Sequence, residues 1–333
     1  MSTHTPTLSV VVNNYNYAQF LSAALDSVLP QLATADELIV VDDGSTDQSP
    51  ALLQRYATEH GITIITQANS GQLQAVCQGL DAATKEVVVL LDSDDIFIPG
   101  YLDRLRTIYS EHPGVDCVFT RPQPFGEDDP AVTATVTNLN NMALRDGPVG
   151  STRWASRLFQ EYVGVPTSGN SLRRALAQDV LPLLRRLNEP LTLSPWLARL
   201  VGVSATETNR PGQSADGALV RCTSLLGAHK YYDSNYGFRY RIHASNKYAN
   251  SSGMARRYLR GLRKQQFARF ANAQPELGRR ATTRELLEEV EQRALPMSAV
   301  RRRLTQLLYC RALLGSRGKP MEKASALSQI MRR

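Results

Sequence analysis

The first hundred residues alternate between short apolar runs and segments whose apolar residues recur at helical spacing. The runs cover residues 8–12, 37–41, 62–66 and 87–91, and each is followed by the three- and four-residue spacing typical of a helix. Parallel strands need such crossovers, so this order predicts an α/β fold with a doubly wound, mostly parallel sheet. The run 87–91 has no polar alternation, which predicts a strand buried on both faces.

Polar side chains follow three of the expected strands, at the point where each strand ends. They are Asn13 and Tyr15 after the first strand, Asp42 and Asp43 after the second, and Asp92, Ser93, Asp94 and Asp95 after the last. The carboxyl ends of parallel strands share one edge of a sheet, where ligands bind in open α/β folds. We therefore expect these side chains to form one nucleotide site.

Asp92 and Asp94 are two residues apart on an extended segment, so their side chains point the same way. Carboxylate oxygens suit Mg²⁺ or Mn²⁺, and such a site completes its coordination with phosphates and water. The alternatives are a solvated acidic loop, or a capping cluster for a helix near Gly100.

Two common nucleotide-binding classes lack their motif here. A dinucleotide-binding fold carries GxGxxG after its first strand, whereas residues 13–17 read NNYNY, without glycine. The GxxxxGK[ST] phosphate loop of P-loop enzymes is also absent from the sequence. A metal at Asp92 and Asp94 would neutralise a diphosphate instead.

Composition and charge indicate where the protein resides and how its C-terminal part differs from the rest. The chain of 333 residues has no apolar stretch long enough to span a bilayer and begins with a polar segment, so we expect a cytoplasmic protein, and its four widely spaced cysteines are expected to be reduced. Residues 253–333 carry 19 Lys+Arg against 6 Asp+Glu, a balance of +13, which leaves −6 for residues 1–252. This basic tail shows helical periodicity.

Two interpretations of the tail stay open. Amphipathic helices with arginine-rich faces bind anionic membrane surfaces, which would place the protein peripherally on the inner face of the membrane. The same apolar stripes could instead pack on the body or on a second subunit in a homo-oligomer. The tail lacks the interleaved aromatic residues of a single-strand binder, so nucleic acid is not an expected partner.

The three runs 8–16 (LSVVVNNYN), 37–47 (ELIVVDDGSTD) and 90–95 (LLDSDD) together closely resemble glycosyltransferase family 2, the inverting enzymes of GT-A fold. The resemblance covers about the first 110 residues. It implies a GT-A-type sheet and a metal-dependent enzyme that moves a sugar from a nucleotide-diphospho-sugar, with a UDP-sugar favoured, to a hydroxyl of a glycan or lipid-linked acceptor. Surface polysaccharide or glycolipid synthesis is the expected setting.

The resemblance also implies roles for individual residues. The metal, Mg²⁺ or Mn²⁺, would be held by Asp94, Asp92 and Asp95. Asp43 would contact the base, and the nucleotide-binding residues would be Asn13, Tyr15, Asp43, Asp42, Gly71, Gln72 and Ser93.

Three features of the second half resemble the family more loosely. Residues 238–246 (FRYRIHASN) resemble its late Tyr-Arg-x-His-x-x-Asn element, which would place Arg241 and His243 near the phosphates or the metal. Upstream, residues 216–227 resemble the helix that carries the general base, so Asp216 is the candidate base; capping of that helix is its alternative role, and Glu207 is the other candidate acid.

Residues 166–171 (PTSGNS) resemble a loop on the acceptor side, which would use Ser168, Gly169 and Asn170, although a plain structural turn explains the same residues. We expect a nucleotide-sugar-binding half over 1–120, an acceptor-binding and catalytic half over 121–252, and a basic helical tail over 253–333. A nucleotidyltransferase and a non-catalytic nucleotide-sugar binder are the alternative functions.

Overall fold

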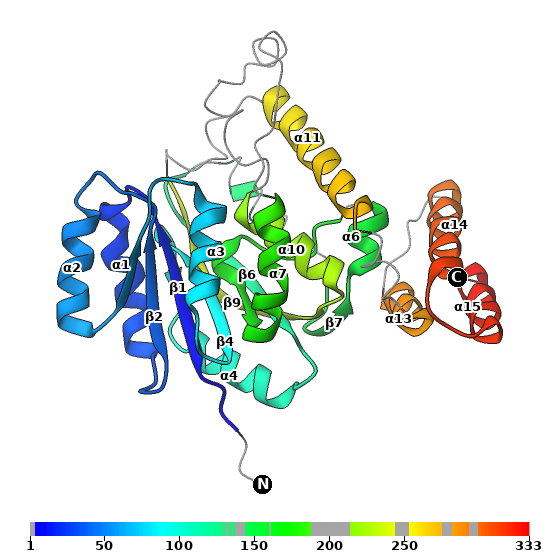
Figure 1. Cartoon of the computed structure of the whole chain (residues 1–333), viewed down its shortest axis with the longest axis horizontal. Helices are drawn as coiled ribbons and strands as arrows, with labels where there is room; N and C mark the ends of the chain where they lie inside the picture. Colours follow the sequence, from blue (N-terminus) through cyan, green and yellow to red (C-terminus); the bar gives the residue numbers. More distant parts are fainter. Residues whose placement is uncertain are drawn as a thin grey trace.

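A computed structural model describes residues 4–128, 144–159, 161–187, 214–243, 253–274, 282–292 and 299–332, with residues 130, 133, 134 and 136 between the first two ranges. Figure 1 shows a central sheet with helices on both sides and a group of C-terminal helices beside it. Glu207, the second candidate acid, lies outside the described residues.

The first half of the chain is the predicted alternation of strands and helices. Its strands are β1 (Leu8–Asn14), β2 (Glu37–Asp42), β3 (Thr63–Thr66) and β4 (Val87–Asp92), and its helices are α1 (Ala18–Val28), η1 (Leu29–Gln31), α2 (Ser49–His60), α3 (Gln72–Ala82) and α4 (Tyr101–Glu111). The four strands are parallel in the order β3-β2-β1-β4. The parallel, doubly wound core is therefore confirmed.

The strand β4 is buried on both faces, as its unbroken apolar run predicts. Val88 and Leu90 pack with α3 in one apolar core, while Val87, Val89 and Leu91 pack with α1 and α4 in the other. All five side chains are fully buried. This rigid strand carries the acidic loop at its carboxyl end.

The second half extends the same sheet and makes it mixed. It contains β5 (Ile96–Phe97), β6 (Cys117–Gly126), β7 (Gly147–Ser151), β8 (Asn170–Arg173) and β9 (His229–Ile242), with α6 (Arg153–Phe159), η2 (Thr167–Gly169), α7 (Arg174–Leu187) and α10 (Ala215–Leu226). The strand β8 lies antiparallel between β4 and β6, and β9 runs parallel to β6. Short β5 pairs antiparallel with β9, so a late strand reaches the acidic loop.

The basic tail forms the helices α11 (Gly253–Asn272), α13 (Thr283–Gln292), α14 (Ala299–Gly315) and α15 (Pro320–Arg332). Phe267 of α11 belongs to the core of the body, whereas α13, α14 and α15 share a small core with Trp154 of α6. The buried Glu289 carboxylate accepts the backbone N–H groups of Trp154 and Ala155, at 2.9 and 2.5 Å. The inner faces of the tail thus pack on the body.

All four cysteines are free thiols, as their spacing predicts, and burial raises the pKa of Cys117 to about 11. Within the described part of the chain, every helix is too short or too polar to cross a bilayer.

Candidate active site

The polar strand ends lie side by side at one edge of the sheet. In the strand register Asn13 is opposite Asp92, and Asn14 is opposite Asp42. The Asn13 amide donates to the Asp92 carboxylate at 2.8 Å, and the Asn14 amide donates to Asp42 at 2.8 Å. The side chain of Tyr15 is 44% exposed just beyond this edge. The polar residues that follow three separate strands therefore form a single site.

The acidic loop gathers three carboxylates. Asp92, Asp94 and Asp95 each place one oxygen within 4.8 Å of the others. Burial and the Asp94 charge raise the pKa of Asp92 to about 7, although hydrogen bonds from Asn13 and Gln72 oppose that rise. Burial together with its two neighbours raises the pKa of Asp95 as well. A divalent cation would offset this concentrated negative charge, and hard oxygen donors suit Mg²⁺ or Mn²⁺.

Asp95 differs from the other two carboxylates in its contacts. It is 1% exposed, and its two oxygens accept hydrogen bonds from the Arg241 backbone N–H at 2.9 Å and from the Ser168 hydroxyl at 2.5 Å. Asp92 and Asp94 carry more exposed surface and face the site. Asp95 thus braces the loop, while Asp92 and Asp94 offer oxygens to a ligand.

The loop with Ser168, Gly169 and Asn170 lies directly behind the acidic loop. The Ser168 hydroxyl also accepts the Asp92 backbone N–H at 3.0 Å and is fully buried. The Asn170 amide donates to the carbonyls of Val165 and Pro166, and a side chain at position 169 would collide with Val165 and Phe238. The contacts of Ser168, Gly169 and Asn170 are therefore those of a structural turn that supports the acidic loop.

The strand β9 brings Arg241 and His243 to the acidic loop, next to each other as the late motif predicts. Arg241 Nε donates to the Asp94 carbonyl at 2.8 Å, and its guanidinium lies over the rings of Phe20 and Phe125. His243 Nε2 lies 3.0 Å from the Asp94 carboxylate. A fixed cation and an imidazole therefore border the carboxylates, the charge arrangement that suits an anionic group beside a metal.

The loop before α3 is shaped by Asp43. Its carboxylate accepts the Gln67 amide at 2.6 Å and the backbone N–H groups of Ser70 and Gly71 at 2.8 Å each. Gly71 has a φ of 89°, a conformation that favours glycine. The next residue, Gln72, donates its amide to the Asp92 carboxylate at 2.8 Å. This loop therefore links the second strand end to the acidic loop.

Two of the expected nucleotide residues are buried in supporting positions. Both oxygens of Asp42 accept hydrogen bonds, one from Asn14 and the Ser45 hydroxyl, the other from the Ser45 backbone. Ser93 is 1% exposed, and its backbone N–H donates to the Asn13 carbonyl at 3.1 Å. These contacts hold the strand ends in register.

Asp216 lies in the first turn of α10, where the family resemblance places a base. The cap of that helix is Ser214, whose hydroxyl accepts the Gly217 N–H at 3.3 Å, so the capping alternative for Asp216 is wrong. The Tyr162 hydroxyl lies 3.3 Å from the Asp216 carboxylate. After burial and the charge of Asp94, the charge of Asp216 also contributes to the raised pKa of Asp92.

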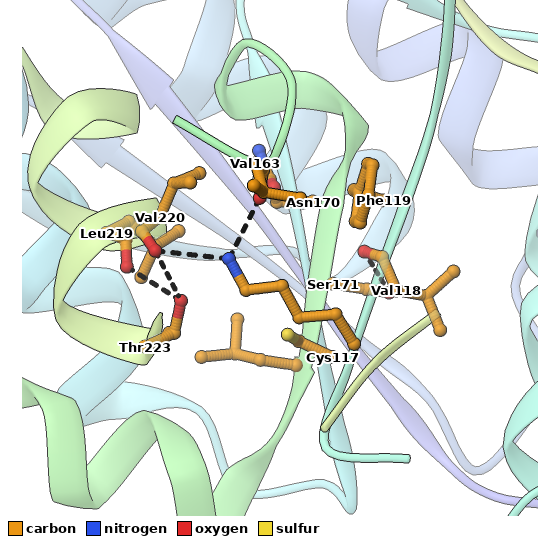
Figure 2. Close-up of a pocket in the computed structure, with 11 residues that line it drawn as sticks. Cys117, Val118, Phe119, Val163, Asn170, Ser171, Leu219, Val220 and Thr223 are labelled. Carbon is orange, nitrogen blue, oxygen red and sulfur yellow. Dashed lines mark hydrogen bonds between the residues drawn. The ribbon is translucent and has the colours of Figure 1, made fainter. Parts of the chain in front are cut away.

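The sequence analysis missed Tyr162 and Lys230, which lie behind Asp216. Lys230 is 2% exposed on β9, and its ammonium donates to the carbonyls of Val163 at 2.9 Å and Val220 at 3.2 Å. It lines the small pocket in which Figure 2 labels Val163 and Val220. It thus ties the segment that carries Tyr162 to the helix that carries Asp216. A lone lysine in a strand gives no sequence signal for such a role.

Lys230 should make stability depend on alkaline pH. Burial lowers its pKa from 10.5 to about 8, so between these values the unfolded chain binds more protons than the folded one and stability rises with pH. We expect the wild type to gain about 2 kcal/mol over Lys230→Met between about pH 8 and 9.5, measured by urea unfolding. Lys264 is exposed and serves as the control: the difference in unfolding free energy between the wild type and Lys264→Met should not change over this pH range. If the wild type and Lys230→Met showed the same pH dependence, Lys230 would not have a lowered pKa in the folded protein.

The comparisons with known proteins agree with this geometry. The structure is similar to that of S. aureus TarS in complex with UDP-GlcNAc, with a TM-score of 0.54 and 15% identity, and the match covers 98% of this chain and 90% of that chain. This likeness defines the fold as the GT-A fold, with the acidic loop at its sheet edge.

The sequence profile of glycosyl transferase family 2 matches residues 9–177, and the chain belongs to that family. An uncharacterized glycosyltransferase of Nostoc sp. is 33% identical over 251 residues, which cover 74% of this chain and 67% of the relative. An undecaprenyl-phosphate 4-deoxy-4-formamido-L-arabinose transferase of Proteus mirabilis is 36% identical over 197 residues, and the match spans 57% of this chain and 55% of that relative. The enzyme class decides against a nucleotidyltransferase and a non-catalytic binder.

Proposed function

We propose that the protein is a metal-dependent inverting glycosyltransferase that moves a sugar from a nucleotide-diphospho-sugar to a hydroxyl of a glycan or lipid-linked acceptor. One observation carries the proposal: Asp92, Asp94 and Asp95 place carboxylate oxygens within 4.8 Å of one another at the sheet edge, and a further carboxylate, Asp216, lies in the first turn of the separate helix α10. An inverting transfer needs this pair of functions, a cation site for the leaving diphosphate and a separate base for the acceptor.

The donor would lie along the strand ends. Asp92 and Asp94 would hold Mg²⁺ or Mn²⁺, braced by Asp95, and the bound cation would neutralise charge on the departing diphosphate. Arg241 and His243 border that position and would add positive charge or hydrogen bonds to the phosphates. The nucleoside would contact the edge formed by Asn13, Tyr15, Asp43, Gly71 and Gln72, with Asp42 and Ser93 supporting it.

The acceptor would be activated by Asp216. Its carboxylate would take the proton of the acceptor hydroxyl while that oxygen attacks the anomeric carbon, and the bond from that carbon to the diphosphate oxygen would break with its electron pair on the diphosphate. Attack from the face opposite the leaving group inverts the anomeric configuration. The Tyr162 hydroxyl, which donates to the Val165 carbonyl at 2.5 Å, lies 3.3 Å from the carboxylate of this base, and the buried turn with Ser168, Gly169 and Asn170 would support the acceptor side.

The acceptor class is supported by relatives rather than by the site. Two of the similar proteins, from Proteus mirabilis and Pseudomonas fluorescens, are named as undecaprenyl-phosphate transferases, which act at a lipid phosphate by name. We propose a lipid-linked or glycan acceptor in surface polysaccharide or glycolipid synthesis, with the enzyme on the cytoplasmic side. We also propose that residues 1–120 bind the nucleotide sugar, that residues 121–252 bind the acceptor and carry the catalytic base, and that residues 253–333 form a basic helical tail.

The donor assignment can be tested with a panel of nucleotide sugars. A bound donor raises stability by mass action, by about 2.7 kcal/mol at a hundredfold excess over its Kd. We expect one UDP-sugar with Mn²⁺ to raise the melting temperature by several degrees, and the same sugar with EDTA to raise it far less. Equal stabilisation with and without metal would contradict the metal-dependent donor site. Stabilisation by a GDP-sugar or a dTDP-sugar alone would show that the nucleobase of the donor is not uracil.

A further inference from the structure

The helices α14 and α15 expose an unusual amount of apolar surface. Of the eight large apolar side chains that are exposed among the described residues, six lie on these two helices. They are Leu307 at 58%, Leu308 at 36%, Leu314 at 70%, Met321 at 86%, Leu327 at 38% and Met331 at 37%. Exposed apolar side chains gathered on two helices that pack together indicate a candidate interaction surface.

These residues are not needed for the fold of the tail. The inner faces of the two helices already fill the core shared with α6 and α13, through residues such as Tyr309, Leu313 and Ile330. The exposed set lies outside that core, on two helices that Figure 1 places at the end of the molecule opposite α2. We call this set, together with the exposed arginines between its members, the outer face of α14–α15.

Cationic and apolar residues alternate along this outer face. Arg303, Leu307, Arg311 and Leu314 are spaced by four, four and three residues, so they follow one stripe of α14, and all four are exposed. Residues 299–333 as a whole carry nine Lys and Arg against one acidic residue, Glu322, a balance of 9 − 1 = +8. The face thus combines apolar side chains with the exposed arginines Arg303 and Arg311, on a segment of net positive charge.

We propose that the outer face of α14–α15 docks on an anionic phospholipid membrane. Helices that lie in a membrane interface bury an apolar stripe below the headgroups while flanking Lys and Arg meet anionic lipids, which is the pattern observed here. A second copy of the chain would bring an equal positive charge against the first, which opposes pairing through this face. Nucleic acid would leave the leucines and methionines without partners, and the sole aromatic residue of 299–333, Tyr309, is fully buried.

This docking would serve the proposed lipid-linked acceptor, but it stands on the outer face alone and not on the donor chemistry. It would hold the enzyme at the surface where such an acceptor lies. Sugar-nucleotide binding, which the strand ends would perform, is a separate property and can be measured in the same variants.

The test is co-sedimentation of the full chain with vesicles of phosphatidylcholine containing about one quarter phosphatidylglycerol. We expect binding to these vesicles and at least about tenfold weaker binding to pure phosphatidylcholine, because the positive charges need anionic headgroups. The triple variant Leu307→Ser, Leu314→Ser, Met321→Ser and the double variant Arg303→Glu, Arg311→Glu should each lose at least about tenfold in affinity.

A matched control reverses the same charge elsewhere. Arg174 and Arg186 are exposed on α7 of the body, and Arg174→Glu with Arg186→Glu should leave vesicle binding unchanged. Equal losses in this control, or full binding by the triple variant, would overturn the proposal, as would a dimer in light scattering that the triple variant dissolves. Thermal stabilisation by a UDP-sugar with Mn²⁺, measured in every variant, should stay at the wild-type value. If the UDP-sugar stabilised neither the variants nor the wild type, that result would refute the donor site and not the docking surface.

Discussion

Asp94→Ala should abolish divalent-metal-dependent sugar transfer, with a fall in kcat/KM of at least about 10²–10³-fold. Asp94 is a partly buried carboxylate of the acidic loop, with 14% of its side chain exposed, and Arg241 and His243 contact it. Removing it takes away one of the two accessible metal ligands, so the charge on the departing diphosphate is no longer offset. The measurement is the initial rate of transfer, or of donor hydrolysis, across a titration of Mn²⁺.

The control for this variant is Asp179→Ala, which removes an exposed carboxylate of α7 far along the chain from the acidic loop. It should keep the wild-type rate and the wild-type Mn²⁺ dependence. If Asp94→Ala retained a Mn²⁺-stimulated rate near that of the wild type, the acidic loop would not be the metal site.

Asp216→Asn should remove transfer while sparing donor binding. The amide keeps the size of the carboxylate but cannot take the proton of an acceptor hydroxyl, a function typically worth 10²–10⁴-fold in rate. Because Asp216 lies on α10 and outside the strand ends, the affinity for UDP with Mn²⁺, measured by calorimetry, should stay within a few-fold of the wild type. The transfer rate is measured with saturating donor.

Ser214→Ala separates this chemistry from helix stability. Ser214 caps α10, so its loss should cost about 1 kcal/mol of stability and leave most of the transfer rate intact. Weak donor binding by Asp216→Asn would move Asp216 from the acceptor side to the donor side. A transfer rate near the wild type in that variant would leave the base to another residue.

Local sequence pattern was sufficient for the donor half of the fold. The strands β1, β2 and β4 end in polar residues that lie in register, because a parallel sheet brings the ends of consecutive strands to one edge. The family resemblance of the late motif, rather than the strand pattern, predicted Arg241 and His243 near the phosphates or the metal, and both contact Asp94. In this half, the sequence motifs lie within a few residues of the side chains that form the candidate site.

The rest depends on contacts between distant segments, which no local pattern encodes. The antiparallel insertion of β8 between β4 and β6 reverses the direction that the first four strands predict. Ser168 was expected beside an acceptor, yet it hydrogen-bonds Asp95, 73 residues earlier in the chain. The lone Lys230 acts through carbonyls of Val163 and Val220, and backbone carbonyls leave no trace in a sequence.

The bracing of Asp95 has a consequence for how this chain could have been assembled or could be recombined. Its two oxygens are held by Ser168 and by the backbone of Arg241, so the loop that carries the donor motif takes its shape from two segments of the other half. An acceptor half from a relative could be exchanged productively only if it brought an equivalent hydroxyl and an equivalent strand N–H to the same places. The two halves are separable in sequence but are not interchangeable parts, because the shape of the acidic loop depends on contacts from both.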